Sequence, residues 1–195
     1  YYKAVTVDKR PLFIQQIDGD SLFLSADTLI RAEPTDSTGY MMAIGNVKIF
    51  KSDLQAICDS LYYSDIDSSF TLFKDPVCWS DTTQFIGDTI SLFLKDGQLR
   101  EIQARSNAFI ASVDSYGYFD QIKGRLIQSF LDSNKLKKMY VKGNAQSIYM
   151  VKDESDAYVG INKTLCSHIN FYFRDKDLSD IRYYEEPDSE MIPFA

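Results

Sequence analysis

Apolar and polar residues alternate with a period of two along much of this chain, and the stretch Ile86–Leu99 shows the pattern clearly. Ile90, Leu92 and Leu94 fall on one side of this stretch, and the residues between them fall on the other. Because successive side chains of a strand point to opposite faces, this spacing predicts a half-buried β-strand. An Asp-Gly turn follows at positions 96 and 97 and predicts a hairpin, because glycine adopts positive φ at little cost.

The remainder of the chain shows further strand-like runs separated by turns rich in Asp, Gly, Ser and Asn. The predicted strands are Tyr1–Val7, Leu12–Ile17, Ser21–Arg31, Tyr40–Phe50, Leu54–Ser64, Phe70–Trp79, Leu99–Val113, Tyr118–Leu131, Leu136–Val151, Tyr158–Arg174 and Leu178–Glu185. No window keeps an i, i+3, i+4, i+7 apolar stripe over three turns. The pattern therefore predicts an all-β protein.

The length and the two ends of the chain predict its domain organisation. We expect one β-domain over residues 1–185 and a flexible tail over Glu186–Ala195, because the tail contains two prolines. The chain opens within a strand and without Met, so we interpret it as a fragment of a longer repeat protein.

Composition and charge narrow the possible functions. The net charge of −7 argues against a nucleic-acid-binding protein, which needs a basic face, and against simple docking to an anionic membrane. The three cysteines, Cys58, Cys78 and Cys166, cannot all pair within one chain, and there is no CxxC motif. We therefore expect no structural zinc site, no other metal and no cofactor.

Two short motifs alternate along the chain and form an internal repeat. The first has a small or polar residue, Asp or a polar substitute, a polar residue and an aliphatic residue, as in Ala26-Asp27-Thr28-Leu29, Cys58-Asp59-Ser60-Leu61 and Gly87-Asp88-Thr89-Ile90, with degraded copies at Lys123-Gly124-Arg125-Leu126 and Cys166-Ser167-His168-Ile169. The second breaks a strand in its middle, as in Gly45-Asn46-Val47, Ser106-Asn107-Ala108 and Gly143-Asn144-Ala145, and Asp75-Pro76-Val77 takes the matching place in its unit.

The repeat predicts the architecture. Each unit is a β-hairpin that buries its apolar face only by stacking on its neighbours. A break at the same point of successive strands supplies a bulge or bend. We therefore expect the whole sheet to fold sharply into a V-shaped section.

At these motifs the chain resembles the OstA-like family, which comprises the periplasmic lipopolysaccharide-transport protein A group and the N-terminal domain of the outer-membrane transport protein D. The resemblance extends from about Asp20 to Glu185. The segment DGDSLFLSADTL is similar to the form of the motif found in Bacteroidetes-type members of the family. It implies an antiparallel β-jellyroll of the taco type, a location in the periplasm of a Gram-negative cell envelope, and a role in lipopolysaccharide transport for outer-membrane biogenesis. It also implies an apolar groove that binds lipid A acyl chains, and partners among the other lipopolysaccharide-transport proteins.

A groove for acyl chains needs same-face apolar residues on the repeated strands. The lipid-binding candidates are Leu61, Tyr63, Ile90, Leu92, Leu94, Ile102, Leu126, Phe130, Met139, Val141, Ile169, Phe171 and Phe173. Because each buried CH₂ group contributes roughly 0.8 kcal/mol, the affinity would come from apolar surface. The alternative is that these residues pack on one another as a dry core. Strand addition at Tyr1–Val7 or Leu178–Glu185 is the expected mode of docking and of possible self-association.

Two other functional classes remain open. One is a structural or interaction β-scaffold without a lipid site, and the other is a carbohydrate-binding β-protein that uses Trp79. We do not expect an enzyme, because nothing in the sequence orients His168 toward Cys166 as a general base. The acidic pairs Asp18/Asp20, Asp65/Asp67 and Asp175/Asp177 lie in turns and form no complete calcium loop.

Overall fold

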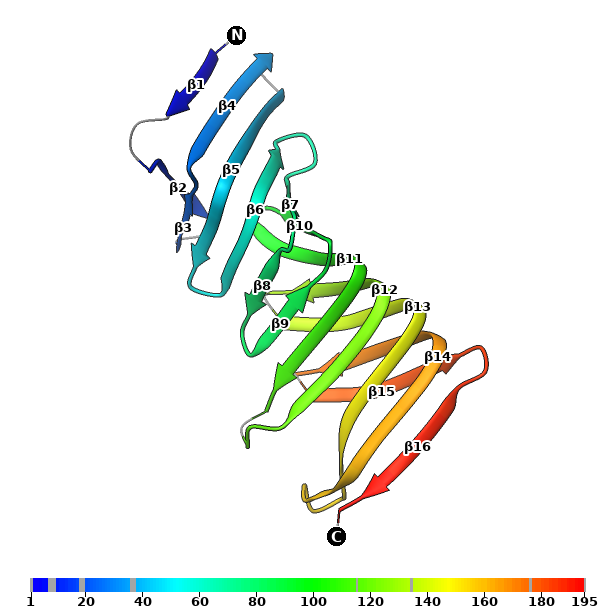
Figure 1. The fold of residues 1–195 in the computed structure, drawn as a ribbon. Coiled ribbons are helices and arrows are strands. Elements are labelled where there is room, and N and C mark those ends of the chain that lie inside the picture. Colours follow the sequence, from blue (N-terminus) through cyan, green and yellow to red (C-terminus); the bar gives the residue numbers. More distant parts are fainter. Residues whose placement is uncertain are drawn as a thin grey trace.

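The structure of the chain is a computed structural model that describes residues 2–6, 10–17, 20–35, 38–114, 116–133, 135–175 and 177–194. The two end residues of the predicted strand Tyr1–Val7 and the predicted turn at Asp18 and Gly19 lie outside the described residues. Figure 1 shows an elongated molecule with the two chain ends at opposite ends of its long axis.

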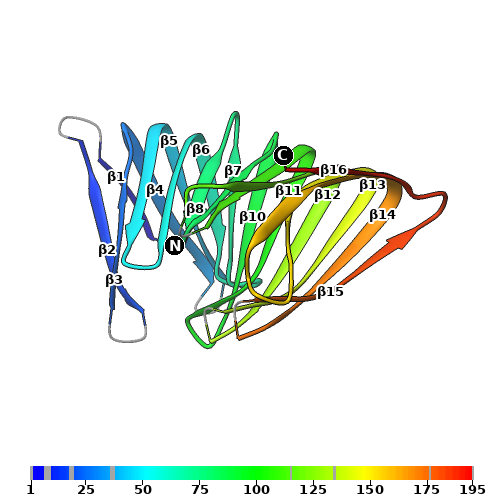
Figure 2. The ribbon, with the colours of Figure 1, turned by 90° about the horizontal axis from the view of Figure 1, so that it is seen from below.

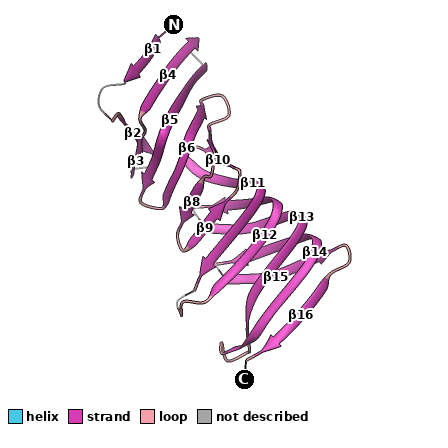
Figure 3. Cartoon of the chain, viewed as in Figure 1, coloured by secondary structure: helices cyan, strands magenta, loops and turns pink. Residues whose placement is uncertain are grey.

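The described chain is built from strands that join into one antiparallel sheet, as the alternating pattern predicted (Figure 3). The strands are β1 (Tyr2–Thr6), β2 (Leu12–Ile17), β3 (Asp20–Ser25), β4 (Thr28–Thr35), β5 (Thr38–Lys51), β6 (Leu54–Ser64), β7 (Ser69–Phe73), β8 (Val77–Ser80), β9 (Thr83–Ile86), β10 (Thr89–Lys95), β11 (Gln98–Val113), β12 (Phe119–Asp132), β13 (Lys135–Lys152), β14 (Tyr158–Arg174), β15 (Asp177–Tyr184) and β16 (Asp188–Pro193). The expected all-β jellyroll of antiparallel hairpins is thereby confirmed.

The sheet is folded lengthwise into two arms, which Figure 2 shows as the sides of a V. Arm A has the strand order β1-β4-β5-β6-β7-β10-β11-β12-β13-β14-β15. Arm B runs through β2, β3, β5, β6, β8, β9, β11, β12, β13, β14 and β16. The long strands β5, β6, β11, β12, β13 and β14 therefore cross the fold line and belong to both arms, whereas the short strands stop at it.

The fold line is made by pairs of residues with positive φ, and all but the last lie at the predicted strand breaks. Such pairs occur at Gly45-Asn46, Lys74-Asp75, Ser106-Asn107, Gly143-Asn144 and Glu185-Glu186. Two left-handed residues in succession bend a strand and leave its register shifted, as the ladder of β5 with β6 shows between Ile44 and Val47. The last pair, at Glu185-Glu186, is a further copy of the break that the sequence motif did not reveal, since it contains neither Gly nor Asn.

Hydrogen bonds between the two repeated motifs explain why Asp and Asn recur together. The Asn46 side chain donates from Nδ2 to Asp27 Oδ2 at 2.7 Å, and the Asn107 side chain donates in the same way to Asp88 at 3.1 Å. The backbone N–H of Asp27 also donates to the carbonyl of Gly45 at 2.9 Å. The Asp of the first motif thus stabilises, by hydrogen bonds, the bend that the second motif makes in a neighbouring strand.

Three expectations about the strands need correction. The segment predicted as a flexible tail contains β16, which pairs with β14 from Gly160↔Pro193 to Leu165↔Asp188. The predicted strands Ser21–Arg31 and Phe70–Trp79 are each two strands, because the chain turns the corner at Asp27 and at Lys74-Asp75. A purely local reading of the pattern extends an alternation through a corner that the backbone breaks.

The cross-strand register places the core in parallel rows along the inside of the V. The row nearest the fold line in arm A is Leu29, Ala43, Leu61, Leu72, Ile90, Ala104, Ile127, Val141, Ile169 and Tyr183. The second row of arm B is Phe13, Leu24, Ile49, Ala56, Cys78, Phe85, Ile110, Ile122, Ser147, Thr164 and Ser189. Each repeat therefore adds its inward residues to continuous interior rows, which are apolar until the arm B row reaches Ser147, Thr164 and Ser189.

Candidate functional site

In the N-terminal half of the molecule the two arms are in contact and their side chains fill the interior. Leu24 and Leu72 are fully buried, and Leu22, Met41 and Leu92 are nearly so. The gap that remains beside Leu92 has a volume of about 30 Å³, which leaves room for a water molecule or two and for no larger ligand. This half is a closed hydrophobic core.

In the C-terminal half the arms diverge and leave a cavity, which we call the C-terminal cavity. Its volume is about 450 Å³, within the range of about 300–1,000 Å³ that is typical of small-molecule sites. A second hollow of about 170 Å³ adjoins it and shares the lining residues Thr82, Thr83, Ser112, Leu136 and Phe173. The two form an extended channel along the inside of the V, between β9 and β15.

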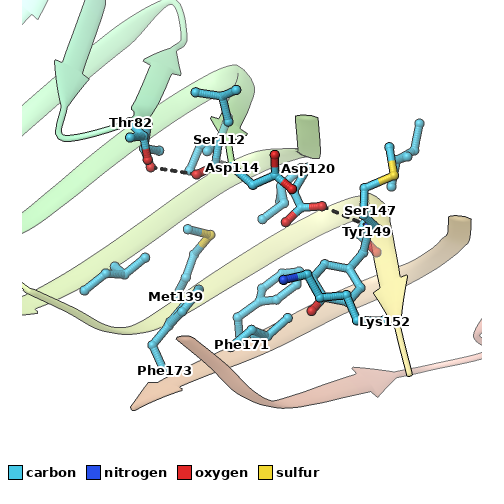
Figure 4. A pocket seen from close by; sticks show the side chains of 18 of the residues that line it. Thr82, Ser112, Asp114, Asp120, Met139, Ser147, Tyr149, Lys152, Phe171 and Phe173 are labelled. Carbon is cyan, nitrogen blue, oxygen red and sulfur yellow. Dashed lines mark hydrogen bonds between the residues drawn. The ribbon is translucent and has the colours of Figure 1, made fainter. Parts of the chain in front are cut away.

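The two walls of the C-terminal cavity differ in chemistry, as Figure 4 shows. Arm A contributes an apolar wall of Leu136, Met139, Phe171, Phe173 and Leu178. Arm B contributes Ile110, Ile122 and Ser147 from one row, followed outward by Ser112, Asp120 and Tyr149, and its four polar residues form a polar wall. The cavity is therefore amphipathic across its width.

Side chains of two hairpin loops hold the rim of the cavity on arm B. Asp114 Oδ1 accepts the backbone N–H groups of Tyr116 and Tyr118 at 2.8 and 2.9 Å, and Asp114 Oδ2 accepts the hydroxyl of Tyr158. Lys152 Nζ lies 2.8 Å from Asp156 Oδ1 and 4.9 Å from the ring centroid of Tyr158. These contacts join the β11–β12 loop to the β13–β14 loop along the rim of arm B.

Asp120 is the half-buried acid of the polar wall. Its Oδ1 accepts the backbone N–H of Met150 at 2.9 Å. Loss of solvent raises the pKa of Asp120 above its usual value, and nearby Asp114 adds to the increase, whereas the hydrogen bond from Met150 and the charge of Lys152 oppose it. Together with Asp114 and Asp156 it makes the mouth acidic, with Lys152 as the cation among the cavity-lining residues.

The structure places most of the predicted groove residues in the interior. Eight are buried: Leu61, Ile90, Leu92, Ile102, Met139, Val141, Ile169 and Phe171. Tyr63, Leu94 and Phe173 are partly buried and pack against this core. Met139, Phe171 and Phe173 line the C-terminal cavity, Leu92 and Leu94 border the small gap, and the others lie in the packed rows.

Leu126 and Phe130 lie on the outer face of the sheet, so the expectation that they face the groove was wrong. The strand β12 shifts register between Lys123 and Leu126, and from there the inward residues are Ile127 and Ser129. Ile127 is the register partner of Ala104 and so corresponds to Ile90. Phe130 instead packs on Tyr140 and lies under Lys138 Nζ. In β6 the corner lies between the buried residues Cys58 and Leu61, and in β12 it lies between the buried Gly124 and Ile127. The motif copy in β12 was therefore assigned one residue too early, and a shift of one residue reverses the face of every side chain.

The sequence prediction missed the polar wall, although the repeat contains the signal. The third residue after the corner Asn is Ile49 in one unit and Ile110 in another, and both are buried. The same position in the next unit is Ser147, which is also buried. The position is apolar in the earlier units and polar at Ser147 and, after the last corner, at Ser189, so the change from apolar to polar marks the place where the core opens.

The other sequence candidates lie outside this cavity. Trp79, the residue of the carbohydrate-binding alternative, pairs with Gln55 and Gln84 and lies on the outer face, whereas its neighbour Cys78 is fully buried. Cys166 donates from Sγ to the backbone carbonyl of His168 at 3.2 Å. The thiol therefore contacts the backbone of His168, which does not provide the general base that a nucleophilic cysteine requires.

The acidic turns stabilise their own backbone. Asp20 accepts hydrogen bonds from Ser52 and Ser21, which lowers the pKa of Asp20 to about 2. Among the residues that the structure describes, no group of three or more His, Cys, Asp or Glu side chains is placed to hold a metal ion. Within the same residues, no helix has the length and apolar character needed to cross a membrane.

The comparisons with known proteins concern the fold. The chain is similar to the crystal structure of LptH from Pseudomonas aeruginosa, the LptA homologous periplasmic component of the conserved lipopolysaccharide transport device. The match covers 71% of this chain and 93% of that chain, with a TM-score of 0.55 and 14% sequence identity. Neither a protein-family model nor a curated protein sequence matches the chain. The likeness shows that this chain has the LptA-like β-jellyroll fold.

Proposed function

We propose that this chain is a non-enzymatic, periplasmic module of lipopolysaccharide transport that holds acyl chains of the lipid in the C-terminal cavity. The observation that carries the proposal is the cavity itself, which opens a sheet interior that in the N-terminal half leaves a gap of only about 30 Å³. Its apolar wall of Met139, Phe171 and Phe173 offers an acyl chain a surface that excludes water. The fold likeness to a periplasmic transport component agrees with this role.

The energetics of such a site are those of apolar burial. Burying about ten CH₂ groups of one chain would contribute roughly 8 kcal/mol before the costs of association are subtracted. One chain therefore binds in the micromolar range or more weakly, and a lipid with several chains binds more tightly. A weak hold on each chain suits a carrier, which must also release its lipid.

The test is to fill the cavity without disturbing the fold. Ser112 lines the cavity and lies half-buried on β11, and its neighbour Ala111 lies on the opposite face of the same strand. We expect Ser112→Phe to abolish saturable photo-crosslinking of a radiolabelled lipid A-type glycolipid. Ala111→Phe should retain it.

The outcome is informative only if both variants unfold cooperatively in urea at a midpoint near that of the unmodified chain. Equal crosslinking to both folded variants would remove the cavity from the proposal. No saturable crosslinking to the unmodified protein would overturn the lipid-carrier function.

The closed N-terminal core favours a second candidate, a structural scaffold. There the interior positions of the repeat are filled by side chains, and the gap beside Leu92 has no room for a ligand larger than water. On this hypothesis the repeat builds a stacking module and the cavity is only the place where two arms part. The crosslinking experiment distinguishes the two functions directly.

We further propose that the ends of the sheet pair with other lipopolysaccharide-transport proteins or with a second copy of this chain. Strands β1 and β15 are the terminal strands of arm A, and β2 and β16 are those of arm B. The edge strand β2 exposes Leu12 and Ile14, and β16 exposes Met191 and Ile192. An unpaired edge with apolar side chains is a ready template for strand addition. Crosslinking of single cysteines introduced on β2 and β16 would test this pairing.

A further inference from the structure

Two buried serine hydroxyls lack a hydrogen-bond partner within the described structure. They are Ser129 Oγ on arm A and Ser147 Oγ on arm B. The side chains are 0% and 2% exposed, so solvent does not compensate them. Leaving a buried hydroxyl unpaired costs free energy, and natural proteins rarely do so without a reason. Only Ser147 of the two is among the residues that line the C-terminal cavity.

Asp120 provides an acceptor beside this hydroxyl. Ser147 is the register partner of Ile122, and Asp120 is the next inward residue along β12. Ser147 and Asp120 are therefore diagonal neighbours on one face of adjacent strands, with about 7–8 Å between such positions. Figure 4 shows both side chains on the polar wall, opposite Met139 and Phe171. A hydroxyl group that lies between them could accept from Ser147 Oγ and donate to the Asp120 carboxylate.

We infer that Ser147 and Asp120 form a subsite for an uncharged hydroxyl group of the bound amphiphile. This inference rests on the proposed function. The apolar part of the ligand lies against arm A, and its hydroxyl lies against arm B. The hydroxyl belongs either to the acyl chain or to a sugar head group, since both present the same chemistry to this wall. An anionic group does not suit the same position, because the described cavity lining contains Asp114, Asp120 and Asp156, and Lys152 is the one cation in that lining.

The experiment compares uncharged probes with and without hydroxyl groups. Methyl dodecanoate and methyl 3-hydroxydodecanoate test a hydroxyl on the chain. Decyl maltoside and the decyl methyl diether of triethylene glycol, which has no hydroxyl, test hydroxyls in the head group. Binding is measured by titration calorimetry below the concentrations at which the probes form micelles. We expect the hydroxylated member of one pair to bind about three- to tenfold more tightly, the effect of one net hydrogen bond.

Two serine variants provide the internal control. Ser147→Ala removes the hydroxyl of a residue that lines the cavity. Ser129→Ala removes a hydroxyl that is also buried and unpaired, but Ser129 does not line the cavity. We expect Ser147→Ala to lose the preference for the hydroxylated probe and to keep its affinity for the plain one. Ser129→Ala should keep the preference.

Each result separates the subsite from the carrier function. If the plain probes bind but neither hydroxylated probe binds more tightly, a bound water satisfies Ser147 and the subsite is overturned while the carrier function stands. A preference that survives in Ser147→Ala overturns the subsite as well. If no probe binds the unmodified protein, both proposals fall. The pair that shows the preference identifies the source of the hydroxyl.

Discussion

The bends that fold the sheet depend on backbone conformation, and three glycines allow this dependence to be measured. Gly45 and Gly143 lie at the fold line with φ of +79°, and Gly117 lies in a loop with φ of +86°. An added Cβ at Gly117 would meet nothing within 4 Å. The Gly117→Ala variant therefore reports the strain of a left-handed alanine by itself.

The magnitudes follow from what each Cβ would contact. An alanine in the left-handed conformation lowers the free energy of unfolding by about 1–2 kcal/mol. Replacing glycine also reduces the conformational entropy of the unfolded chain, which offsets this loss by about 0.4–1 kcal/mol. The net loss for Gly117→Ala should therefore be about 1 kcal/mol. At Gly143 the Cβ would meet the flexible Arg125 side chain at 2.9 Å, which adds a small cost of displacement. At Gly45 it would meet Asp27 Oδ2 at 2.5 Å, and moving Asp27 breaks its hydrogen bond with Asn46. We expect about 2–3 kcal/mol for Gly45→Ala, because a hydrogen bond of about 1 kcal/mol is lost in addition.

Urea unfolding followed by the fluorescence of Trp79, the single tryptophan, measures the series. The expected order of destabilisation is Gly117→Ala, Gly143→Ala and then Gly45→Ala, with unchanged slopes. The variant Asp27→Ala in the Gly45→Ala background should add little, since the contact is already broken. Equal losses at all three glycines would refute the reasoning, because backbone strain alone would then explain them and the Asp–Asn tie would contribute nothing.

Three further predictions use the same unfolding assay or simple labelling. Leu72→Ala should cost about 2–5 kcal/mol because Leu72 is fully buried, whereas Leu126→Ala on the outer face should cost less than about 1 kcal/mol; similar losses would contradict the assigned faces. Burial raises the pKa of the Cys58 and Cys78 thiols to about 12. Both thiols should therefore resist alkylation by iodoacetamide at pH 8 until urea unfolds the chain, and mass spectrometry would measure the alkylation. Because burial raises the pKa of Asp120 in the folded state, its ionisation destabilises the fold above that pKa. Asp120→Asn should therefore raise stability at neutral pH, and this gain should vanish as the pH falls below the ordinary value of 3.8; a gain that persists there would contradict the assigned cause.

The architecture was predictable from the sequence because the same pattern recurs in successive units. The alternation indicated which residues face inward on most strands, and the Asp and Asn motifs marked the bends where the hydrogen bonds of Asp27 and Asp88 hold them. Prediction failed where the residues at a corner no longer resemble the motif. In β12 the degraded motif was aligned one residue too early, so Leu126 was taken for the inward residue in place of Ile127. The left-handed pair Glu185-Glu186 carries no residue typical of a bend.

The candidate site was predictable only in part, because an apolar interior position has the same sequence whether it packs on a partner or lines a cavity. Leu92 and Phe171 obey the same alternation, yet the first borders a water-sized gap and the second borders the large cavity. The distance between the arms decides the difference, and this distance depends on the side chains of both walls together. A single strand does not contain that information.

The exception to the repeat, rather than the repeat, is what points to function. If the chain were selected only to stack, position 147 would gain from an aliphatic residue like Ile49 or Ile110, because an apolar side chain there would bury surface and leave no unpaired hydroxyl. Ser147 instead keeps a costly hydroxyl beside the half-buried Asp120, at the level where the arms part. Both residues destabilise the folded chain by the same physical cause, the loss of solvent around a polar group. A bound partner that supplies the missing hydrogen bond would recover that cost, so the instability of the polar wall is itself the argument for a ligand there.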